Sequence, residues 1–289
     1  MEIDKAEEIG LCFGVRRAVK LLEEAASKYG EIETLGPVAH NQQLVERLIK
    51  AGVKPARHLN QVQSKILAVT THGTSPKVLS EIKTRHIHII DTTCPIVRKA
   101  QNTAKELAEA GFDVIIFGEA EHSEVQGLLG WAKGNGIATL DAKQIGTLLK
   151  QVQDKKPYHL GIISQTTQLQ PALAEFVGQV ATFALNQVQG KSKEIRFINT
   201  LCGIVQRRQE AAVKLAKRNQ IMVVIGGHNS ANTRRLAEAC SRIVETHLVE
   251  TANEVDSNWF AGKPHVGITA GTSTPNEIID EIVTKLKSL

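Results

Sequence analysis

The cysteines are the residues of this chain that could do distinctive chemistry. Four occur, Cys12, Cys94, Cys202 and Cys240, and no two are close enough in sequence to form a local metal-binding pair. A single cysteine is more often a small buried hydrophobic residue than a ligand. As thiolates, however, cysteines bind metals or attack electrophiles. Their function therefore depends on whether the fold brings them together.

An internal repeat relates three of the four cysteines. Residues 90–118 align without a gap with residues 198–226 at a constant offset of 108, with ten identical positions, and Cys94 falls on Cys202. A fainter copy lies 82 residues earlier, where Cys12 falls on Cys94. Cys240 has no counterpart and is expected to pack in a core. Three repeats that differ at most positions have thus kept a cysteine at one equivalent place.

Each repeated cysteine is predicted to stand at the start of a helix. Apolar residues follow at helical spacing, as in Val15, Ala18 and Leu22. Pro95 directly after Cys94 suits the first helical position, and the positive end of the helix dipole favours a thiolate there. Each helix should lead into a buried strand and then a polar loop.

The polar loops carry a second set of equivalent residues. His40, His122 and Ser230 correspond, as do Gln42, Glu124 and Asn232. A strand running into a hydroxyl-rich turn and another helix also recurs three times, over residues 67–79, 160–173 and 266–279, and His72 lies in the first of these turns. Polar loops at the carboxyl ends of parallel strands are where open α/β sheets bind ligands, and small hydroxyl residues before a helix suit phosphate.

These patterns predict three α/β units, each with a parallel sheet, over residues 1–88, 89–196 and 197–289. Threefold packing would bring the three thiols to one point, which suggests a metal centre. A structural zinc site normally adds a fourth protein ligand, whereas an iron–sulfur cluster held by cysteines alone can leave one iron open for chemistry. The residues by themselves leave both metals possible.

Composition narrows the class of protein. With 289 residues, 42% hydrophobic and 22% charged side chains, the chain can bury a large core. The net charge of +5 fits an anionic small ligand better than DNA, and 11 aromatic residues make stacking on single-stranded nucleic acid improbable. The absence of a long apolar run and of a basic, then apolar, start predicts a soluble cytoplasmic protein with no membrane association.

Several motifs resemble a known family in order and spacing along the whole chain. They are GLCFGVRRAV (10–19), PVAHN (37–41), THG (71–73), DTTCP (91–95), HSEVQG (122–127), SQTT (164–167), TLCGIVQRRQEA (200–211), GGHNSANTRRL (226–236) and TAGTSTP (269–275). The family is 4-hydroxy-3-methylbut-2-enyl diphosphate reductase (IspH/LytB). The resemblance implies the last step of the methylerythritol phosphate pathway, in which two electrons reductively remove the hydroxyl of an allylic diphosphate to give isopentenyl and dimethylallyl diphosphate. It also implies a trefoil of three α/β units around a central, oxygen-sensitive [4Fe–4S] cluster, one per chain.

The resemblance also assigns roles to individual residues. It implies Cys12, Cys94 and Cys202 as the three cluster ligands, leaving one iron open for the substrate hydroxyl, and Glu124 as the proton donor. The positions that match substrate-binding residues of the family are His40, His72, His122, Thr166, Ser230, Ala231, Asn232 and Ser273. An electron-donor protein of the ferredoxin or flavodoxin type is the implied partner.

Two departures from the family pattern concern the substrate loops. The family commonly has Ser-Ser-Asn where this chain has Ser230-Ala231-Asn232, which removes one hydroxyl donor, and His-Pro-Glu where this chain has His122-Ser123-Glu124. Neither changes a predicted ligand or the acid. They bear on substrate affinity and loop stiffness.

Two other classes of function compete with this interpretation. One is a hydrolase or transferase with a single nucleophilic thiolate, such as Cys94 with His122. The other is a non-catalytic phosphate-binding or regulatory module in which the three cysteines belong to the core. The triplicated cysteine argues against both. Visible absorption of protein purified without oxygen separates the three cases.

Overall fold

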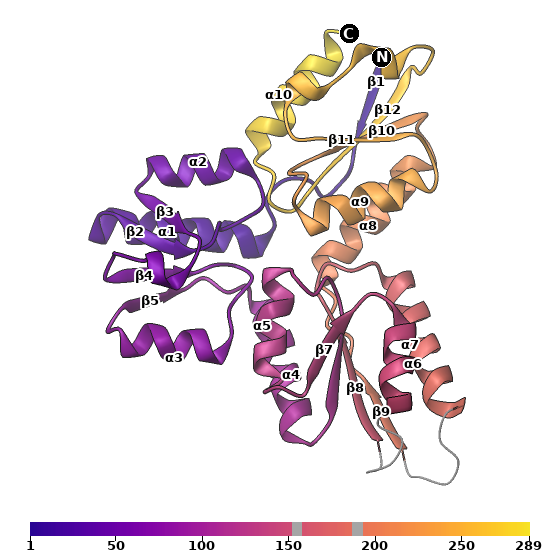
Figure 1. Ribbon diagram of the computed structural model, residues 1–289. Helices are drawn as coiled ribbons and strands as arrows, with labels where there is room; N and C mark the ends of the chain where they lie inside the picture. Colours follow the sequence, from indigo (N-terminus) through magenta and orange to yellow (C-terminus); the bar gives the residue numbers. More distant parts are fainter. Residues whose placement is uncertain (152–157, 187–192) are drawn as a thin grey trace. The chain divides into compact units, whose positions relative to one another are not determined.

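The structure is a computed structural model that describes residues 1–151, 158–186 and 193–289 (Figure 1). The chain forms two compact units. Unit 1 comprises residues 1–71, 88–92 and 203–289, and unit 2 comprises residues 72–87 and 93–202. Within the described residues, unit 1 holds two four-stranded sheets and unit 2 holds one, and all neighbouring strands are parallel.

The first sheet of unit 1 has the strand order β3-β2-β4-β5. Its strands and the two helices packed with them are β2 (Ile32–Leu35), β3 (Val53–Ala56), β4 (Ile66–Val69), β5 (His88–Asp91), α1 (Phe13–Tyr29) and α2 (Gln42–Lys50). The expected apolar face of α1, Val15, Ala18 and Leu22, is buried in the core of this sheet. A short 3-10 helix, η1 (Leu59–Gln61), precedes β4.

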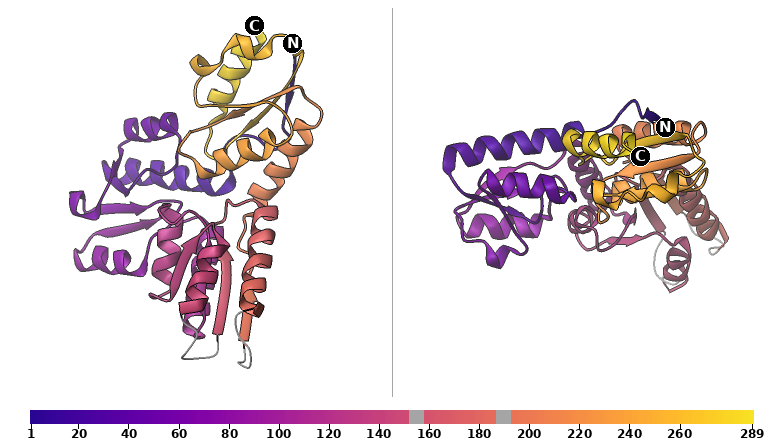
Figure 2. Two further views of the ribbon diagram at one scale, coloured as in Figure 1. Left: turned by 45° about the vertical axis from the view of Figure 1, so that its right-hand side comes forward. Right: turned by 90° about the horizontal axis from the view of Figure 1, so that it is seen from above.

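The second sheet of unit 1 has the order β1-β12-β10-β11. Its elements are β1 (Glu2–Lys5), α8 (Gly203–Ala216), β10 (Ile221–Ile225), α9 (Ala231–Ser241), β11 (Thr246–Val249), η2 (Ala252–Glu254), η3 (Ser257–Phe260), β12 (His265–Ala270) and α10 (Asn276–Lys287). Alternate residues of β10 face opposite sides: Val223 packs with α10, and Val224 packs with α8 and α9. Helices therefore cover both faces of this sheet, as the two views in Figure 2 also show.

The sheet of unit 2 has the order β7-β6-β8-β9. The elements of unit 2 are α3 (Pro76–Thr84), α4 (Pro95–Glu109), β6 (Asp113–Phe117), α5 (Ser123–Trp131), β7 (Gly136–Thr139), α6 (Ala142–Gln151), β8 (Tyr158–Ser164), α7 (Gln170–Asn186) and β9 (Lys193–Phe197). Ile115 on β6 packs with α6 and α7, whereas Ile116 packs with α4 and α5. The near-continuous apolar strands that the repeat contains are thus explained by burial on both faces.

The predicted α/β class with parallel sheets is confirmed, as are the buried strands after the helices and the three strand–turn–helix elements. The domain boundaries 1–88, 89–196 and 197–289, and a trefoil arrangement of the three, remain predictions. Sheet membership is less local than those segments suggest. The N-terminal strand β1 pairs with β12, so that Ile3 lies beside Val266, and β5 spans the expected first boundary.

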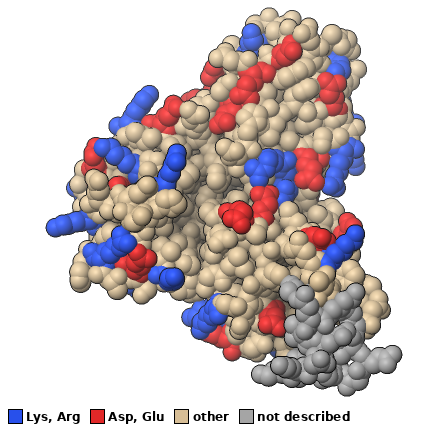
Figure 3. All heavy atoms as spheres, in the orientation of Figure 1, with Lys and Arg blue, Asp and Glu red and all other residues tan. Residues whose placement is uncertain are grey.

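Charged side chains of both signs are interspersed on the face shown in Figure 3. Ion pairs also form within each unit, for example Lys54 with Glu31 at 2.6 Å in unit 1 and Lys133 with Glu109 at 2.7 Å in unit 2. No described helix is both long enough and apolar enough to cross a membrane.

Candidate functional site

The three repeated cysteines stand where the sequence predicted, directly before helices. Cys12 and Cys94 are the N-caps of α1 and α4, and Cys202 precedes the first residue of α8. Neither Cys12 nor Cys94 uses its side chain to cap its helix. All three are partly exposed. Each of the three cysteines is thus placed at the N-terminal end of a helix, where the helix dipole is positive.

Cys240 has a different environment. It is fully buried on α9 in the core between α8, α9 and the second sheet of unit 1. Burial raises the pKa of the Cys240 thiol to about 12. Its predicted role as a core residue is confirmed, and the contrast with the other three cysteines follows the repeat.

The hydroxyl-rich turns hold the backbone of two of these cysteines. The Cys202 N–H donates to the Thr166 carbonyl at 2.8 Å, and the Cys12 N–H donates to the Thr272 carbonyl at 2.9 Å. Thr166 is two residues beyond the end of β8, and Thr272 is two residues beyond the end of β12. The same geometry is thus repeated in unit 2 and unit 1. The sequence predicted both turns as ligand-binding loops, but it did not predict their hydrogen bonds to the cysteine backbone.

Glu124 is a buried carboxyl group at the start of α5. Its side chain is only 2% exposed, and both oxygens are bonded: the Thr166 N–H donates to Oε1 at 2.7 Å and the Thr166 hydroxyl donates to Oε2 at 3.0 Å. Burial raises the pKa of Glu124 to about 7, although the two bonds from Thr166 act in the opposite direction. A carboxyl group with this pKa can hold and release a proton near neutral pH.

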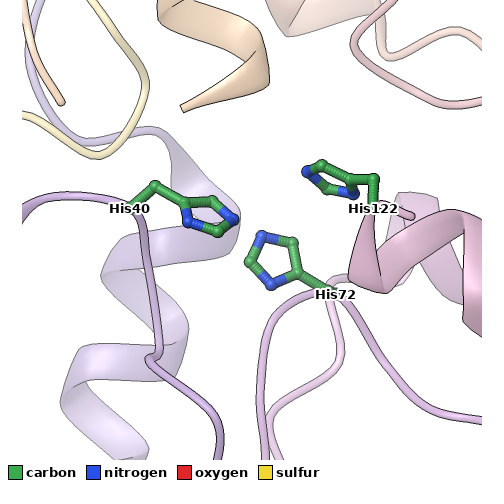
Figure 4. Close-up of side chains that lie close together, drawn as sticks. All are labelled: His40, His72 and His122. Carbon is green, nitrogen blue, oxygen red and sulfur yellow. The ribbon is translucent and has the colours of Figure 1, made fainter. Parts of the chain in front are cut away.

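His122 caps the same helix. Its Nδ1 accepts a hydrogen bond from the Glu124 N–H at 3.2 Å, so the neutral imidazole carries its proton on Nε2 and can donate from that atom. His72, from the loop between β4 and α3, lies beside it, with the two ring centroids 5.4 Å apart and the rings nearly perpendicular (Figure 4). Unit 2 therefore brings together Glu124, Thr166, His122 and His72.

The start of α9 in unit 1 presents hydroxyl and amide groups instead. Ser230 caps the helix through its Oγ, which accepts from the Thr233 N–H at 3.3 Å. Ala231 and Asn232 follow and are buried, and within the described part of the chain the Asn232 Nδ2 has no hydrogen-bond partner. A buried amide donor of this kind is suited to an acceptor that comes from outside the protein.

The turn that carries Ser273 packs against the start of α9. A Cβ atom added to Gly271 would lie 2.2 Å from the Thr233 Oγ1, so only glycine fits this contact. The turn is also tied to the end of β10, because the Thr274 hydroxyl donates to the Ile225 carbonyl at 3.1 Å. Ser273 itself is buried. Unit 1 thus holds Ser230, Asn232 and Ser273 on two adjoining segments.

His40 differs from its predicted equivalents in one detail. His122 and Ser230 are N-caps, but Asn41, not His40, caps α2, because the Asn41 Oδ1 accepts from the Leu44 N–H at 2.9 Å. Asparagine is a strong capping residue, so α2 begins one residue later than the alignment implies. The His40 loop is packed tightly in unit 1: a Cβ atom added to Gly227 would lie 2.0 Å from the His40 carbonyl oxygen.

Sequence reasoning missed Glu250, which holds this loop. The Gln42 N–H donates to the Glu250 Oε1, and the Gln43 Nε2 donates to the Glu250 carbonyl, both at 3.3 Å. The same residue lines a cavity of about 420 Å³ beside His40. Glu250 directly follows β11, so the rule that strand ends carry functional groups was the signal that could have found it.

Comparison with known proteins supports the family suggested by these motifs. The model of the LytB protein family matches residues 3–287. The chain is 44% identical over 289 residues to a protein of Dehalococcoides mccartyi (strain CBDB1), covering 100% of this chain and 99% of the relative, and 40% identical over 290 residues to one of Geobacter metallireducens, covering 100% and 98%. Both are named 4-hydroxy-3-methylbut-2-enyl diphosphate reductase.

Two solved structures are similar over nearly the full chain. A structure of (E)-4-hydroxy-3-methyl-but-2-enyl diphosphate reductase, described as the terminal enzyme of the non-mevalonate pathway, has 36% identity and a TM-score of 0.69, with 100% of each chain covered. The E-1-hydroxy-2-methyl-but-2-enyl-4-diphosphate reductase of Plasmodium falciparum has 25% identity and a TM-score of 0.89, with 99% of this chain and 88% of that one covered. By the family model and by full-length identity, this chain belongs to the LytB protein family.

Proposed function

We propose that this protein is a 4-hydroxy-3-methylbut-2-enyl diphosphate reductase. It removes the hydroxyl group of this allylic diphosphate with two electrons and two protons, releases water, and yields isopentenyl or dimethylallyl diphosphate, the last step of the methylerythritol phosphate pathway. The observation that carries the proposal is Glu124, a buried carboxyl group with a pKa of about 7 in the same unit as two of the three repeated cysteines.

Cys12, Cys94 and Cys202 are the proposed ligands of a [4Fe–4S] cluster, one per chain. The donor set fits such a group: three partly exposed thiols at helix starts, of which Cys12 and Cys94 do not cap their helices, against a fourth thiol that is fully buried. When bound, the cluster supplies the electrons, and its iron without a cysteine ligand supplies a Lewis acid for the hydroxyl oxygen.

Glu124 is the proposed proton donor. Hydroxide is a poor leaving group, and a carboxylic acid that protonates the departing oxygen lets it leave as water. Thr166 orients the carboxyl group with its N–H and its hydroxyl, and the Thr166 carbonyl holds the Cys202 N–H. Thr166 thus positions both the carboxyl group of Glu124 and the start of α8, which follows the proposed ligand Cys202.

The diphosphate of the substrate is the proposed acceptor for two groups of donors. In unit 2 these are His72 and the Nε2–H of His122; the donors in unit 1 are His40, Ser230, Asn232 and Ser273. Their bonds to the diphosphate supply binding energy remote from the reacting carbon–oxygen bond. Ala231 contributes no hydroxyl at the position where the family commonly has serine.

Purification without oxygen followed by cysteine replacement tests this function. Wild-type protein is expected to be brown, to contain about four iron atoms per chain, and to reduce the substrate with a chemical electron donor. Cys12→Ser, Cys94→Ser and Cys202→Ser should each lose iron and activity, whereas Cys240→Ser should keep both. A colourless wild-type protein that hydrolyses esters and depends only on Cys94 would identify a thiolate enzyme instead.

The remaining parts of the proposal concern the partner and the location. A ferredoxin or flavodoxin in the cytoplasm is the proposed electron donor. Reduction of the bound cluster by each candidate, followed by its visible absorption, distinguishes them.

A further inference from the structure

The loop that carries His72 lies in a different unit from the strand that precedes it. β4 belongs to unit 1, and the chain passes into unit 2 between Thr71 and His72. The position of His72 beside His122 is therefore set by contacts of residues 72–75 within unit 2. Residues of α5 and α4, together with Thr93, make those contacts.

Gly127, Gly130 and Trp131 form the face of α5 that receives this loop. A Cβ atom added to Gly130 would lie 2.3 Å from the Ser75 Cβ, so no larger residue fits without moving the loop. One turn earlier, a Cβ atom added to Gly127 would be 3.8 Å from the His72 carbonyl oxygen. The Trp131 indole N–H donates to the Thr74 carbonyl at 3.0 Å. The absence of a side chain at Gly130 thus lets the loop lie close against α5, with Gly127 beside the His72 carbonyl, and the Trp131 N–H bonds the loop to the helix.

The loop also packs against Gln101 of α4 and against Thr93, which precedes that helix. Gly73 has a φ of +70°, and a Cβ atom there would lie 2.2 Å from the Gln101 Nε2 and 3.1 Å from the Thr93 Cγ2. The Gln101 Oε1 in turn accepts from the Arg98 Nη1 at 3.1 Å. Because the loop contacts both α4 and α5, it has little freedom to shift. His72 is consequently held at a fixed place relative to His122, the N-cap of α5.

We propose that Trp131 is a positioning residue that, together with Gly127 and Gly130, holds His72 beside His122 so that the two imidazoles act as one anion-binding pair. A ring nitrogen of each lies within 4.8 Å of the other. Since each charge-assisted bond spans about 2.7–2.9 Å, both nitrogens can bond the oxygens of a single phosphate group. The assignment of that anion as the substrate diphosphate rests on the proposed function.

Replacement of the two tryptophans of the chain tests the role of Trp131. Trp131→Phe keeps an aromatic ring but removes the N–H donor; Trp259→Phe, in unit 1 and stacked on His247, is the matched control. Calorimetric titration of anaerobic protein with inorganic diphosphate should show affinity about two- to tenfold weaker for Trp131→Phe, the range expected for one hydrogen bond, and unchanged for Trp259→Phe. The KM for the substrate should rise by the same factor with kcat unchanged, because Glu124 and Thr166 are not disturbed.

A pair of glycine variants tests the close approach of the loop. Gly130→Ala should displace Ser75 and weaken diphosphate binding more than Trp131→Phe does. Gly178→Ala, in α7 and with open space for its Cβ, should bind as the wild type does. If Gly130→Ala does not fold, the tryptophan pair still decides the question.

The outcomes separate this proposal from the proposed function. Wild-type protein that binds diphosphate but does not reduce the substrate would end the proposed function, and Trp131 would still be judged by the affinity of its variant. Unchanged diphosphate affinity in Trp131→Phe, a fall in kcat without a rise in KM, or wild-type protein that binds no diphosphate would each overturn the positioning role.

Discussion

The first turns of α5 and α9 occupy equivalent places in two repeats but have different chemistry. In α5 the buried Glu124 has both oxygens bonded by Thr166, and its pKa is about 7. In α9 Asn232 is also buried, and its Nδ2 has no hydrogen-bond acceptor among the described residues. Both helices begin in the same way, with a loop residue as the N-cap and a buried polar residue two positions later. In unit 2 that polar residue is a carboxyl group that can donate a proton. In unit 1 it is an amide whose N–H group can donate a hydrogen bond to a ligand.

The difference shows how a repeated fold can divide its functions. A carboxyl group satisfied inside the protein can store a proton, because burial disfavours its charged form. An amide left without a partner costs about 1–3 kcal/mol until an acceptor arrives, so part of the binding energy of a ligand comes from satisfying it. Substitutions in the first turn of either helix, or in the turn packed against α9, test this division.

The largest effect is expected from Glu124→Gln. Glutamine keeps the shape of the side chain but cannot transfer the proton, so turnover should fall by about 10²–10⁴-fold while diphosphate still binds. The control is Glu121→Gln, an exposed carboxyl group in the preceding loop. Steady-state kinetics of protein with a full complement of iron measures the change. Near-normal turnover of the Glu124→Gln variant would exclude this residue as the essential proton source.

Glu124 should also make stability depend on pH. Its pKa rises from an ordinary value of 4.5 to about 7 on folding, so the folded protein binds the proton more tightly than the unfolded chain. The free energy of unfolding therefore falls as the pH rises from 4.5 to 7, by roughly 3 kcal/mol from this group. Glu124→Gln should remove that fall. Urea unfolding of both proteins in a Trp259→Phe background, followed by Trp131 fluorescence, reports on unit 2; parallel pH profiles would contradict the prediction.

In α9, Asn232→Ala should weaken diphosphate binding without changing proton transfer by Glu124. Loss of one charge-assisted bond to the diphosphate weakens affinity by about one to two powers of ten, and Ser273→Ala should act in the same way. The visible spectrum of the cluster and kcat at saturating substrate should not change. Calorimetry with inorganic diphosphate measures the effect, with Asn229→Ala, an exposed residue of the preceding loop, as the control. Unchanged affinity for both Asn232→Ala and Ser273→Ala would remove α9 from the binding site.

The smallest effect is expected from Ala231→Ser. It restores the hydroxyl that this chain lacks between Ser230 and Asn232, so diphosphate should bind equally well or up to a few-fold more tightly. The substrate's free alcohol, which lacks the diphosphate, should bind no better than before. A loss of affinity would mean that the buried site of Ala231 has no room for the added oxygen.

The sequence predicted those features that the repeat encodes locally. Cys12, Cys94 and Cys202 at helix starts, Cys240 in a core and the hydroxyl-rich turns after buried strands all follow from residue type and short-range spacing. Helix α2 begins one residue later than its alignment with α5 and α9 predicts. The reason is that Asn41 is a strong capping residue, and an alignment of positions does not reveal this property of its side chain.

Contacts between distant segments could not be predicted in this way. Glu250 bonds to Gln42 across 208 positions, and Trp131 bonds to Thr74 across 57. Glu250 and Trp131 lie outside the equivalent loop positions of the repeats, so the repeat did not predict that either residue contacts the functional loops. The pairing of β1 with β12 is of the same kind, because an isolated four-residue strand carries no information about its partner.

The pairing of β1 with β12 also determines when the second sheet of unit 1 can form during protein synthesis. Among the described strands, β1 is synthesised before all others and β12 after them, yet Glu2 pairs with His265 and the Thr272 carbonyl in the turn after β12 accepts from the Cys12 N–H. All strands of the other two sheets have been synthesised by then. The N–H of Cys12, the first of the three cysteines to be translated, can therefore be bonded only after the turn that follows β12 has been made. If the proposed cluster uses all three cysteines, we expect its assembly to follow the pairing of β1 with β12.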